Sequence, residues 1–413
     1  MDFNDTPEEA AFRAKVRAWL TANAPRRIEG ESPPSILAME GADAELIARS
    51  KAWQAKKAAE GYAAISWPKE YGGMGGTPMQ NVIYSQEEAH FDVSSDLFIL
   101  GLGLAMPTLM VLGSPAQKER FIKPALYGEE IWCQLFSEPG AGSDLAGVRT
   151  RAEKDGDEWV VNGQKIWTTL GHIADWGILV ARTDPNKPKH KGLSFFLLDM
   201  KTPGITVKQI KQISGASSFN EIFFENVRIP DANRVGKEGD GWKAALTVLM
   251  NERVVVGNLS AGHGVGEFLS LARDTQLADG PAIRNAAVRE KIADWYIQSE
   301  GLKYIHYRTL TAISKGVTPG AENAISKAVG AVYGQDLPHF AMELMDMGGI
   351  IRDAELSPHE AGFQEAWITS PALRIGGGTD EILRNIIAEQ VLGLPGDIRV
   401  DKDMPFNASP GNK

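Results

Sequence analysis

The sequence contains almost no cysteine: Cys133 is the only one in 413 residues. A disulfide within the chain is therefore excluded, and a reducing compartment is expected. We expect Cys133 itself to be a small apolar core residue. The N-terminal residues are acidic, without the apolar run of a signal peptide or the arginines of a presequence, so we expect a cytoplasmic protein.

Long apolar runs and an excess of positive charge are also missing. No stretch approaches the ~18 apolar residues that span a bilayer, so no integral membrane segment is expected. A formal net charge of −10 argues against nucleic acid or an acidic membrane as partner, although a local basic pocket for a phosphorylated ligand remains compatible with it. No residues cluster with the spacing of metal ligands, so we expect no metal.

The period of the apolar residues divides the chain into four parts. Helical spacing dominates residues 1–130, beginning at a capping box at Thr6, and short strand-like runs with an Asp-Gly hairpin signal fill 131–237. Helical spacing returns over 238–395, and the tail 396–413 is rich in turn residues and expected to be flexible. The order predicts an α+β multidomain fold.

The stretch from Cys133 to Asp144, CQLFSEPGAGSD, joins the first helical region to the strands. An apolar strand runs into a loop that Pro139 begins and in which Gly140 and Gly142 permit unusual backbone conformations. Such a loop can bring backbone N–H groups close to an anionic or heteroaromatic ligand. On composition alone, an ordinary surface turn is an equally good interpretation.

The whole string closely resembles the signature loop of the acyl-CoA dehydrogenase family, FAD-dependent enzymes that desaturate acyl-CoA thioesters. The resemblance implies an N-terminal α-helical domain, a middle β-barrel or sandwich domain and a C-terminal four-helix bundle. It also implies that Gln134, Ser137 and Gly142 contact the flavin, and that Ser143 contacts the flavin or the CoA moiety.

Two further blocks resemble family motifs around the cofactor. In Lys165–Trp176 the family's flavin-covering indole and flavin-binding threonine correspond to Trp167 and Thr169, whereas Leu170 replaces the usual asparagine. Residues 374–385 resemble the closing motif, which assigns cofactor contacts to Thr379 and Glu381. The pair Gly348 and Gly349 resembles the segment that reaches the FAD of a neighbouring subunit.

The catalytic base is not where most of the family carries it, because Gly377 occupies the position of the usual glutamate. Glu252 lies between Leu249 and Val256 on the apolar face of a predicted helix, where an unpaired carboxylate has a raised pKa suited to a base. A buried partner for an arginine is the alternative. Long-chain and isovaleryl-type members carry their glutamate on this helix before an arginine, which favours Glu252 as base and Arg253 as a CoA contact.

The substrate contacts follow from the same resemblance. The N–H of Gly377 would still donate to the thioester oxygen, a kind of donor whose loss costs ~3 kcal/mol, and Gly378 would lie beside the substrate. Residues 97–106 resemble the helix lining the acyl cavity, with Leu102 and Gly103 as contacts. Two glycines in an uncharged helix suggest a roomy apolar pocket, and so a branched or bulky acyl group.

The sequence therefore predicts an FAD-dependent acyl-CoA dehydrogenase of fatty acid metabolism and β-oxidation, a homodimer or homotetramer that passes electrons to an electron-transfer flavoprotein. Two alternatives stay open. One is a flavin-containing acyl-CoA lyase, such as a desulfinase, or an oxidase on the same fold. The other is a chain that is not an enzyme by itself but one subunit of a heteromeric dehydrogenase, for example a heterotetramer in which a second chain completes the FAD site. The presence of Glu252 argues instead for a catalytic role.

Overall fold

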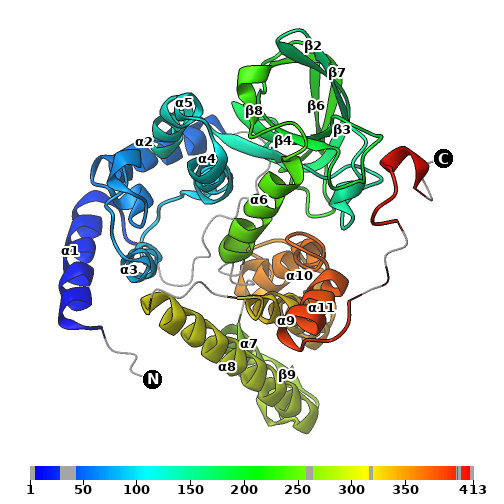
Figure 1. Ribbon diagram of the computed structural model, residues 1–413. Helices are drawn as coiled ribbons and strands as arrows, with labels where there is room; N and C mark the ends of the chain where they lie inside the picture. The colour runs from blue at the N-terminus through cyan, green and yellow to red at the C-terminus, as the bar shows by residue number, and fades with distance from the viewer. Residues whose placement is uncertain are drawn as a thin grey trace. The chain divides into compact units, whose positions relative to one another are not determined.

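The computed structural model describes residues 5–27, 43–256, 264–315, 320–396, 398 and 401–409; the described side chains exclude those of 252–256, 310, 313 and 314. The chain divides into two compact units (Figure 1). The first comprises Met1–Glu252 together with Asp397–Lys413, and the second comprises Arg253–Gly396.

The N-terminal part of the first unit is helical, and local sequence motifs mark where several of these helices begin. They are α1 (Pro7–Asn23), α2 (Ala44–Ala59), α3 (Pro78–Glu88), α4 (Met106–Leu112) and α5 (Pro115–Leu126). Capping boxes begin α1, α3 and α5, at Thr6, Thr77 and Ser114, each followed by a proline. The first N–H groups of a helix have no partner within the helix, so proline, which lacks an N–H, is well tolerated there. The capping box and the proline therefore both mark the helix start.

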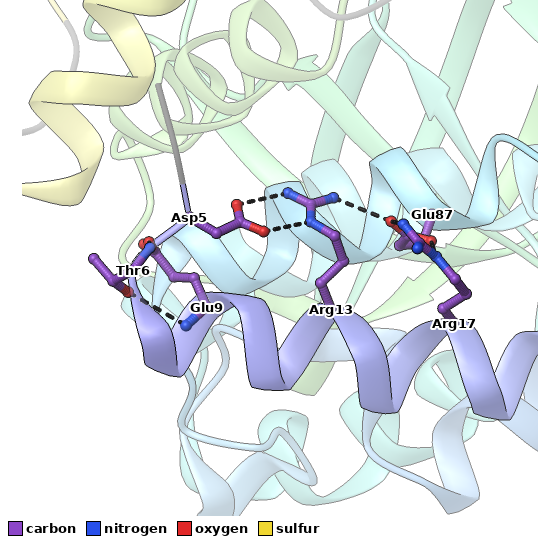
Figure 2. A network of polar contacts seen from close by, with 6 residues as sticks. All are labelled: Asp5, Thr6, Glu9, Arg13, Arg17 and Glu87. Carbon is purple, nitrogen blue, oxygen red and sulfur yellow. Dashed lines mark hydrogen bonds and ion pairs between the residues drawn. The ribbon is translucent and has the colours of Figure 1, made fainter. Parts of the chain in front are cut away.

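A carboxylate on α3 holds α1 in place (Figure 2). Glu87 accepts from Arg17 Nε at 2.7 Å and from Arg13 Nη1 at 3.2 Å, while Arg13 Nε also donates to Asp5 at 2.6 Å. The bond from Arg17, aided by Arg13, holds the pKa of Glu87 below its usual range despite burial. Beneath this network Phe12, Val16 and Leu20 fill the core between the helices.

The region that contains the expected acyl-cavity helix, residues 97–106, is divided into three pieces. A 3₁₀ turn (Asp96–Phe98) and a π-helix (Gly101–Ala105) precede α4. A Cβ at Gly101 would lie 3.2 Å from the ring of Trp132, so a glycine is favoured where this segment approaches Trp132. π-Helical turns cost hydrogen-bond geometry and are frequent at functional sites.

The middle of the chain is one eight-stranded sheet in the order β6-β7-β3-β2-β4-β5-β8, with β1 paired in parallel to β4. Its strands are β1 (Trp132–Leu135), β2 (Arg151–Asp155), β3 (Glu158–Thr169), β4 (Trp176–Arg182), β5 (Leu193–Asp199), β6 (Ile205–Ile210), β7 (Phe219–Pro230) and β8 (Arg234–Val235). The expected Asp-Gly hairpin joins β2 to β3, with Gly156 at φ 61. The long β3–β7 ribbon carries register shifts at Val161/Gly163 and at Lys165/Thr168.

Residues 401–409, expected to belong to a flexible tail, instead pack against the β domain. Phe406 N donates to Lys187 O at 2.9 Å, and the Phe406 ring lies 3.7 Å from the guanidinium carbon of Arg182. Arg182 is itself buried, and burial lowers its pKa to about 10. The aromatic ring covers a buried cation, which explains why a segment rich in turn residues is held.

The second unit is helical. It contains α7 (Val265–Asp274), α8 (Ala286–Ser314), α9 (Asn323–Leu344), α10 (Gly362–Leu373) and α11 (Asp380–Ile386), and α6 (Gly241–Val256) leads into it. Phe268, Trp295, Leu337 and Phe363 form its core. Helix α8 is long because its backbone continues through Gly301 and Leu302 without a break.

None of the described helices combines the length and apolar character that crossing a bilayer requires. In the same described part of the chain, no group of His, Cys, Asp or Glu side chains is arranged to hold a metal ion. The cytoplasmic location expected from the sequence stays a prediction.

Candidate active site

The signature loop is a tight turn with one open face. Glu138 and Ala141 exchange backbone hydrogen bonds of 3.0 Å in both directions, which closes the turn around Pro139 and Gly140. A Cβ built on Gly140 or Gly142 would meet nothing within 4 Å. Gly142 and Ser143 are exposed, whereas Gln134 and Ser137 are half-buried where the loop leaves β1. The loop can therefore approach a ligand closely from its open side.

A buried ion pair fixes this loop to β3. Lys165 Nζ donates to Glu138 Oε1 and to Phe136 O, both at 2.8 Å, and Lys165 is fully buried. Glu138 also accepts the backbone N–H groups of Arg149 and Thr150. Burial acts to raise the pKa of Glu138, but Lys165 and these N–H groups outweigh it and lower the pKa. Sequence analysis missed this pair; a lysine at an alternating buried position of a strand was the available sign.

The segment after Lys165 is a strained bulge. Trp167 has φ 61 and Leu170 has φ 60. Both lie in the left-handed backbone region, which residues other than glycine and asparagine rarely adopt. The Ile166 N–H donates to Ser137 O at 2.9 Å, which brings the bulge beside the signature loop. Trp167 is 56% exposed and meets Phe219 edge-on at 6.0 Å, and Thr169 is half-buried. The expected flavin contacts on both segments thus lie together.

Several polar atoms on and next to this bulge are buried. Thr168 Oγ1 has no hydrogen-bond partner among the described residues, and Asn220 Oδ1 and both ring nitrogens of His172 are buried as well. Asn220 Nδ2, in contrast, donates to Thr168 O at 2.9 Å and to Ser218 O at 3.2 Å. Burial lowers the pKa of His172, which favours its neutral form. Asn220 was not singled out from the sequence, because no local pattern reveals a bond across the β3–β7 ribbon.

The expected acyl-cavity residues lie in the same unit. Leu102 and Gly103, both half-buried, belong to the π-helix. Leu102 packs against an apolar cluster formed by Leu97, Phe98, Ile131 and Leu170. This cluster joins the π-helix to the end of the bulge.

The closing motif, in the second unit, forms a loop shaped by glycine. Gly377 has φ 69 and Gly378 φ 97, so a side chain at either position is strained. Thr379 caps α11 by accepting from Ile382 N at 3.3 Å, and Glu381 is exposed in the first turn. The backbone of this loop therefore leads directly into a helix N-terminus.

Side chains of the loop and of α9 hold this loop in place. Arg374 Nε donates to Asp380 Oδ2 at 2.8 Å, and Arg374 Nη1 donates to Oε1 of Gln335, a residue of α9, at 3.0 Å. Lys327 donates to the carbonyl of Gly378. The loop conformation is thus set by α9 as well as by the glycines.

Gly348 and Gly349 lie just after α9, in a 3₁₀ turn (Asp346–Ile350). Gln364 Nε2 donates to Gly348 O at 3.3 Å. A Cβ on Gly349 would come within 2.1 Å of Met342 O, so packing alone requires glycine there. A cofactor role for this pair stays a prediction.

Glu252 and Arg253 belong to α6 by their backbone. Their side chains lie outside the described residues, so the assignment of Glu252 as base stays a prediction.

Comparison with known families accounts for almost the whole chain. Family models of the acyl-CoA dehydrogenase N-terminal, middle and C-terminal domains match residues 6–129, 133–227 and 239–392. The chain belongs to the acyl-CoA dehydrogenase family. The family and the three-part fold predicted from the sequence are confirmed, and the chain is an FAD-dependent oxidoreductase of the β-oxidation type.

Two curated relatives come from Mycobacterium tuberculosis. Acyl-CoA dehydrogenase IpdE1 is 37% identical over 93% of this chain and 97% of its own length. Acyl-CoA dehydrogenase FadE34 is 38% identical over 81% of this chain, which spans only 45% of FadE34.

Two solved structures share the fold. A structure entitled "Tcur3481-Tcur3483 steroid ACAD" superposes with a TM-score of 0.78 at 26% identity, covering 96% of this chain and 100% of that one. The ChsE4-ChsE5 complex from Mycobacterium tuberculosis gives a TM-score of 0.76 at 28% identity, over 96% of this chain and 100% of the other.

The residues of this acyl-CoA dehydrogenase fit the cofactor. The signature loop is open at Gly140 and Gly142, and the adjacent bulge presents an exposed indole and a threonine. Backbone N–H groups and an aromatic face suit a heteroaromatic ring that carries oxygens and nitrogens on its edge. Gln134, Ser137, Trp167 and Thr169 are the residues that would hold it.

Proposed function

We propose that this enzyme catalyses α,β-desaturation of an acyl-CoA whose acyl group is branched or bulky. The observation that carries the proposal is that a glycine, Gly377, stands where most of the family has its glutamate, so this position has a backbone N–H but no carboxylate. The base must then come from elsewhere, and Glu252 on α6 is the candidate.

Each of the chain's own groups would have a separate role in the reaction. Glu252 takes the α proton, and the Gly377 N–H donates to the thioester oxygen as negative charge develops there. A backbone donor of this kind is worth ~3 kcal/mol. FAD, when bound, accepts the β hydrogen as hydride. Arg253 contacts the CoA moiety, and Ser143 and Gly378 border the substrate.

The size of the acyl group is proposed from the π-helix. Leu102 and Gly103 would border the acyl chain, and a glycine there leaves space that a larger side chain would fill. The structure titled a steroid enzyme supports a bulky substrate class by likeness alone.

The assembly and the electron acceptor are also proposed. A homodimer or homotetramer that reduces an electron-transfer flavoprotein is the first candidate. A heteromeric enzyme is the second, favoured by the similarity to the ChsE4-ChsE5 complex. Mass measurement of the native protein, purified with its neighbours, separates the two.

The reaction is tested by mixing the purified enzyme anaerobically with a panel of acyl-CoAs, beside Glu252→Gln. We expect bulky thioesters to bleach the oxidised flavin band more than butyryl-CoA does, and the variant to lose the bleaching while keeping its flavin. Bound flavin that no thioester bleaches would favour the lyase instead, and turnover with oxygen alone would favour an oxidase.

A further inference from the structure

The bulge between Trp167 and Leu170 combines features that rarely occur together. Both residues are left-handed without being glycine, and they bracket Thr168 and Thr169. Such conformations are unfavourable and persist only where the surrounding contacts hold them in place. The contacts of Leu170 must therefore hold its left-handed conformation in place.

Leu170 is fully buried although it ends a bulge whose Trp167 is exposed. It packs with Leu97, Phe98 and Ile131. Burial of a leucine side chain stabilises the fold by an amount comparable to the cost of its left-handed backbone, so this packing offsets the strain. Packing thus explains the leucine where the family usually has asparagine, a residue that tolerates this backbone.

The apolar cluster that stabilises Leu170 also contacts the segment expected to line the acyl cavity. Leu97 and Phe98 lie in the 3₁₀ turn shortly before the π-helix, and Leu102 packs against the same cluster. The backbone of Leu170 is held at the same time by Ser218 O, which accepts its N–H at 3.0 Å. Leu170 is therefore anchored to the β domain by its backbone and to the acyl-side helix by its side chain.

We propose that Leu170 is a positioning residue that couples the acyl-binding segment around Leu102 to the flavin-contacting bulge at Trp167 and Thr169. A bulky acyl group that displaces Leu102 moves the cluster and, through Leu170, the bulge. Leu170 thereby contributes to acyl selectivity without touching the substrate. This inference rests on the proposed function, which places the acyl group at Leu102.

The strain is tested by comparing Leu170→Ala with Leu170→Gly in the purified holoenzyme. Both lose the side chain, but glycine tolerates φ 60 and alanine does not, so we expect Leu170→Gly to melt at the higher temperature. At an ordinary position glycine is the less stable of the two. The reverse order would overturn the claim of strain.

The coupling is tested in the holoenzyme with Leu170→Ala, with Leu170→Met as the conservative variant and Leu20→Ala as a buried-leucine control in the N-terminal core. We expect Leu170→Ala to change the ratio of kcat/KM for a ring-containing thioester to that for butyryl-CoA by roughly tenfold, a shift typical of one altered apolar contact. It should also alter the visible spectrum of the bound flavin. Leu170→Met should restore both, and Leu20→Ala should leave both unchanged.

The spectrum separates this inference from the proposed function, because it needs no substrate. If wild type bleaches with no thioester but Leu170→Ala still shifts the flavin spectrum, the reaction assignment fails and the contact between Leu170 and the bulge stands. If Leu170→Ala lowers the melting temperature as Leu20→Ala does, with the selectivity ratio and spectrum of wild type, the coupling is wrong. Should Leu170→Ala not fold, the same readouts are made on Leu170→Gly, which tolerates the left-handed backbone.

Discussion

Lys165 and Glu138 form a charged pair in the interior of the β domain, between two segments that we propose as flavin contacts. Removing one partner of a buried pair leaves an uncompensated charge, which is costlier than the pair itself. We expect Lys165→Met to reduce the free energy of unfolding by about 3–5 kcal/mol and the double variant Lys165→Met, Glu138→Gln by clearly less.

The measurement is denaturant unfolding of the FAD-free protein. Lys189→Met is the matched control, because Lys189 pairs with Asp144 in the same loop but near solvent, where such a pair contributes ~0–1 kcal/mol. Equal effects at Lys165 and Lys189 would contradict the role given to the buried pair.

Asp231 should make the β domain sensitive to acid. Arg234 Nε and Trp159 Nε1 donate to its carboxylate at 2.9 and 2.6 Å, and these bonds lower its pKa to about 2. A carboxyl with a depressed pKa stabilises the fold above its unfolded pKa, and this contribution is lost as the pH falls from about 4 to about 2. Asp231→Asn should be less stable than wild type at pH 6, with a difference that shrinks through this window in melting experiments. A constant difference would mean that Asp231 does not titrate as proposed.

At the scale of elements, the glycine loop before α11 should tolerate no side chain at Gly377. Its φ of 69 makes Gly377→Ala costly by about 1–2 kcal/mol, whereas Gly376→Ala meets only Ala372 O at an ordinary 3.4 Å. Melting temperatures of the two variants provide the comparison. Similar values would show that the loop adopts another conformation in solution.

Helices with strong local signals were predictable from the sequence, and those decided by distant contacts were not. The capping box at Thr6 and the apolar repeat Phe12, Val16, Leu20 set α1 locally. The π-helix at Gly101–Ala105, in contrast, depends on the approach of Trp132, which a helical period does not reveal. The bulge at Trp167 depends likewise on Ser137 and Asn220, which are remote in sequence.

The same distinction between local motifs and distant contacts applies to the candidate site. Loop residues such as Ser137 and Trp167 could be named because their motifs are contiguous. Lys165 and Glu138 stand inside those motifs and were passed over, since burial of a lysine appears only when the sheet is assembled. The family was therefore predictable, whereas the contacts that hold its site in shape were not.

At the scale of the whole molecule, the C-terminal segment 401–409 should be a structural part of the β domain. Phe406 is buried against Arg182, whose guanidinium also donates to the carbonyls of Ala146 and Lys189. We expect Phe406→Ala to lower stability by about 3–5 kcal/mol, because it opens a cavity beside a buried cation.

Thermal unfolding measures this effect, with Met404→Ala as control, since Met404 in the same segment is 36% exposed. Protease digestion should release the segment sooner in the Phe406 variant than in wild type. A Phe406 variant as stable as the control would show that the segment is not needed by the domain.

The backbone at Gly377 also limits how this enzyme can evolve. One nucleotide change turns some glycine codons into glutamate codons, so a carboxylate at the common family position is genetically near. The first mutant, however, carries a side chain on a left-handed residue and loses stability before it gains a base. The loop and its α9 contacts would have to change first, which makes the present arrangement hard to reverse in a single step.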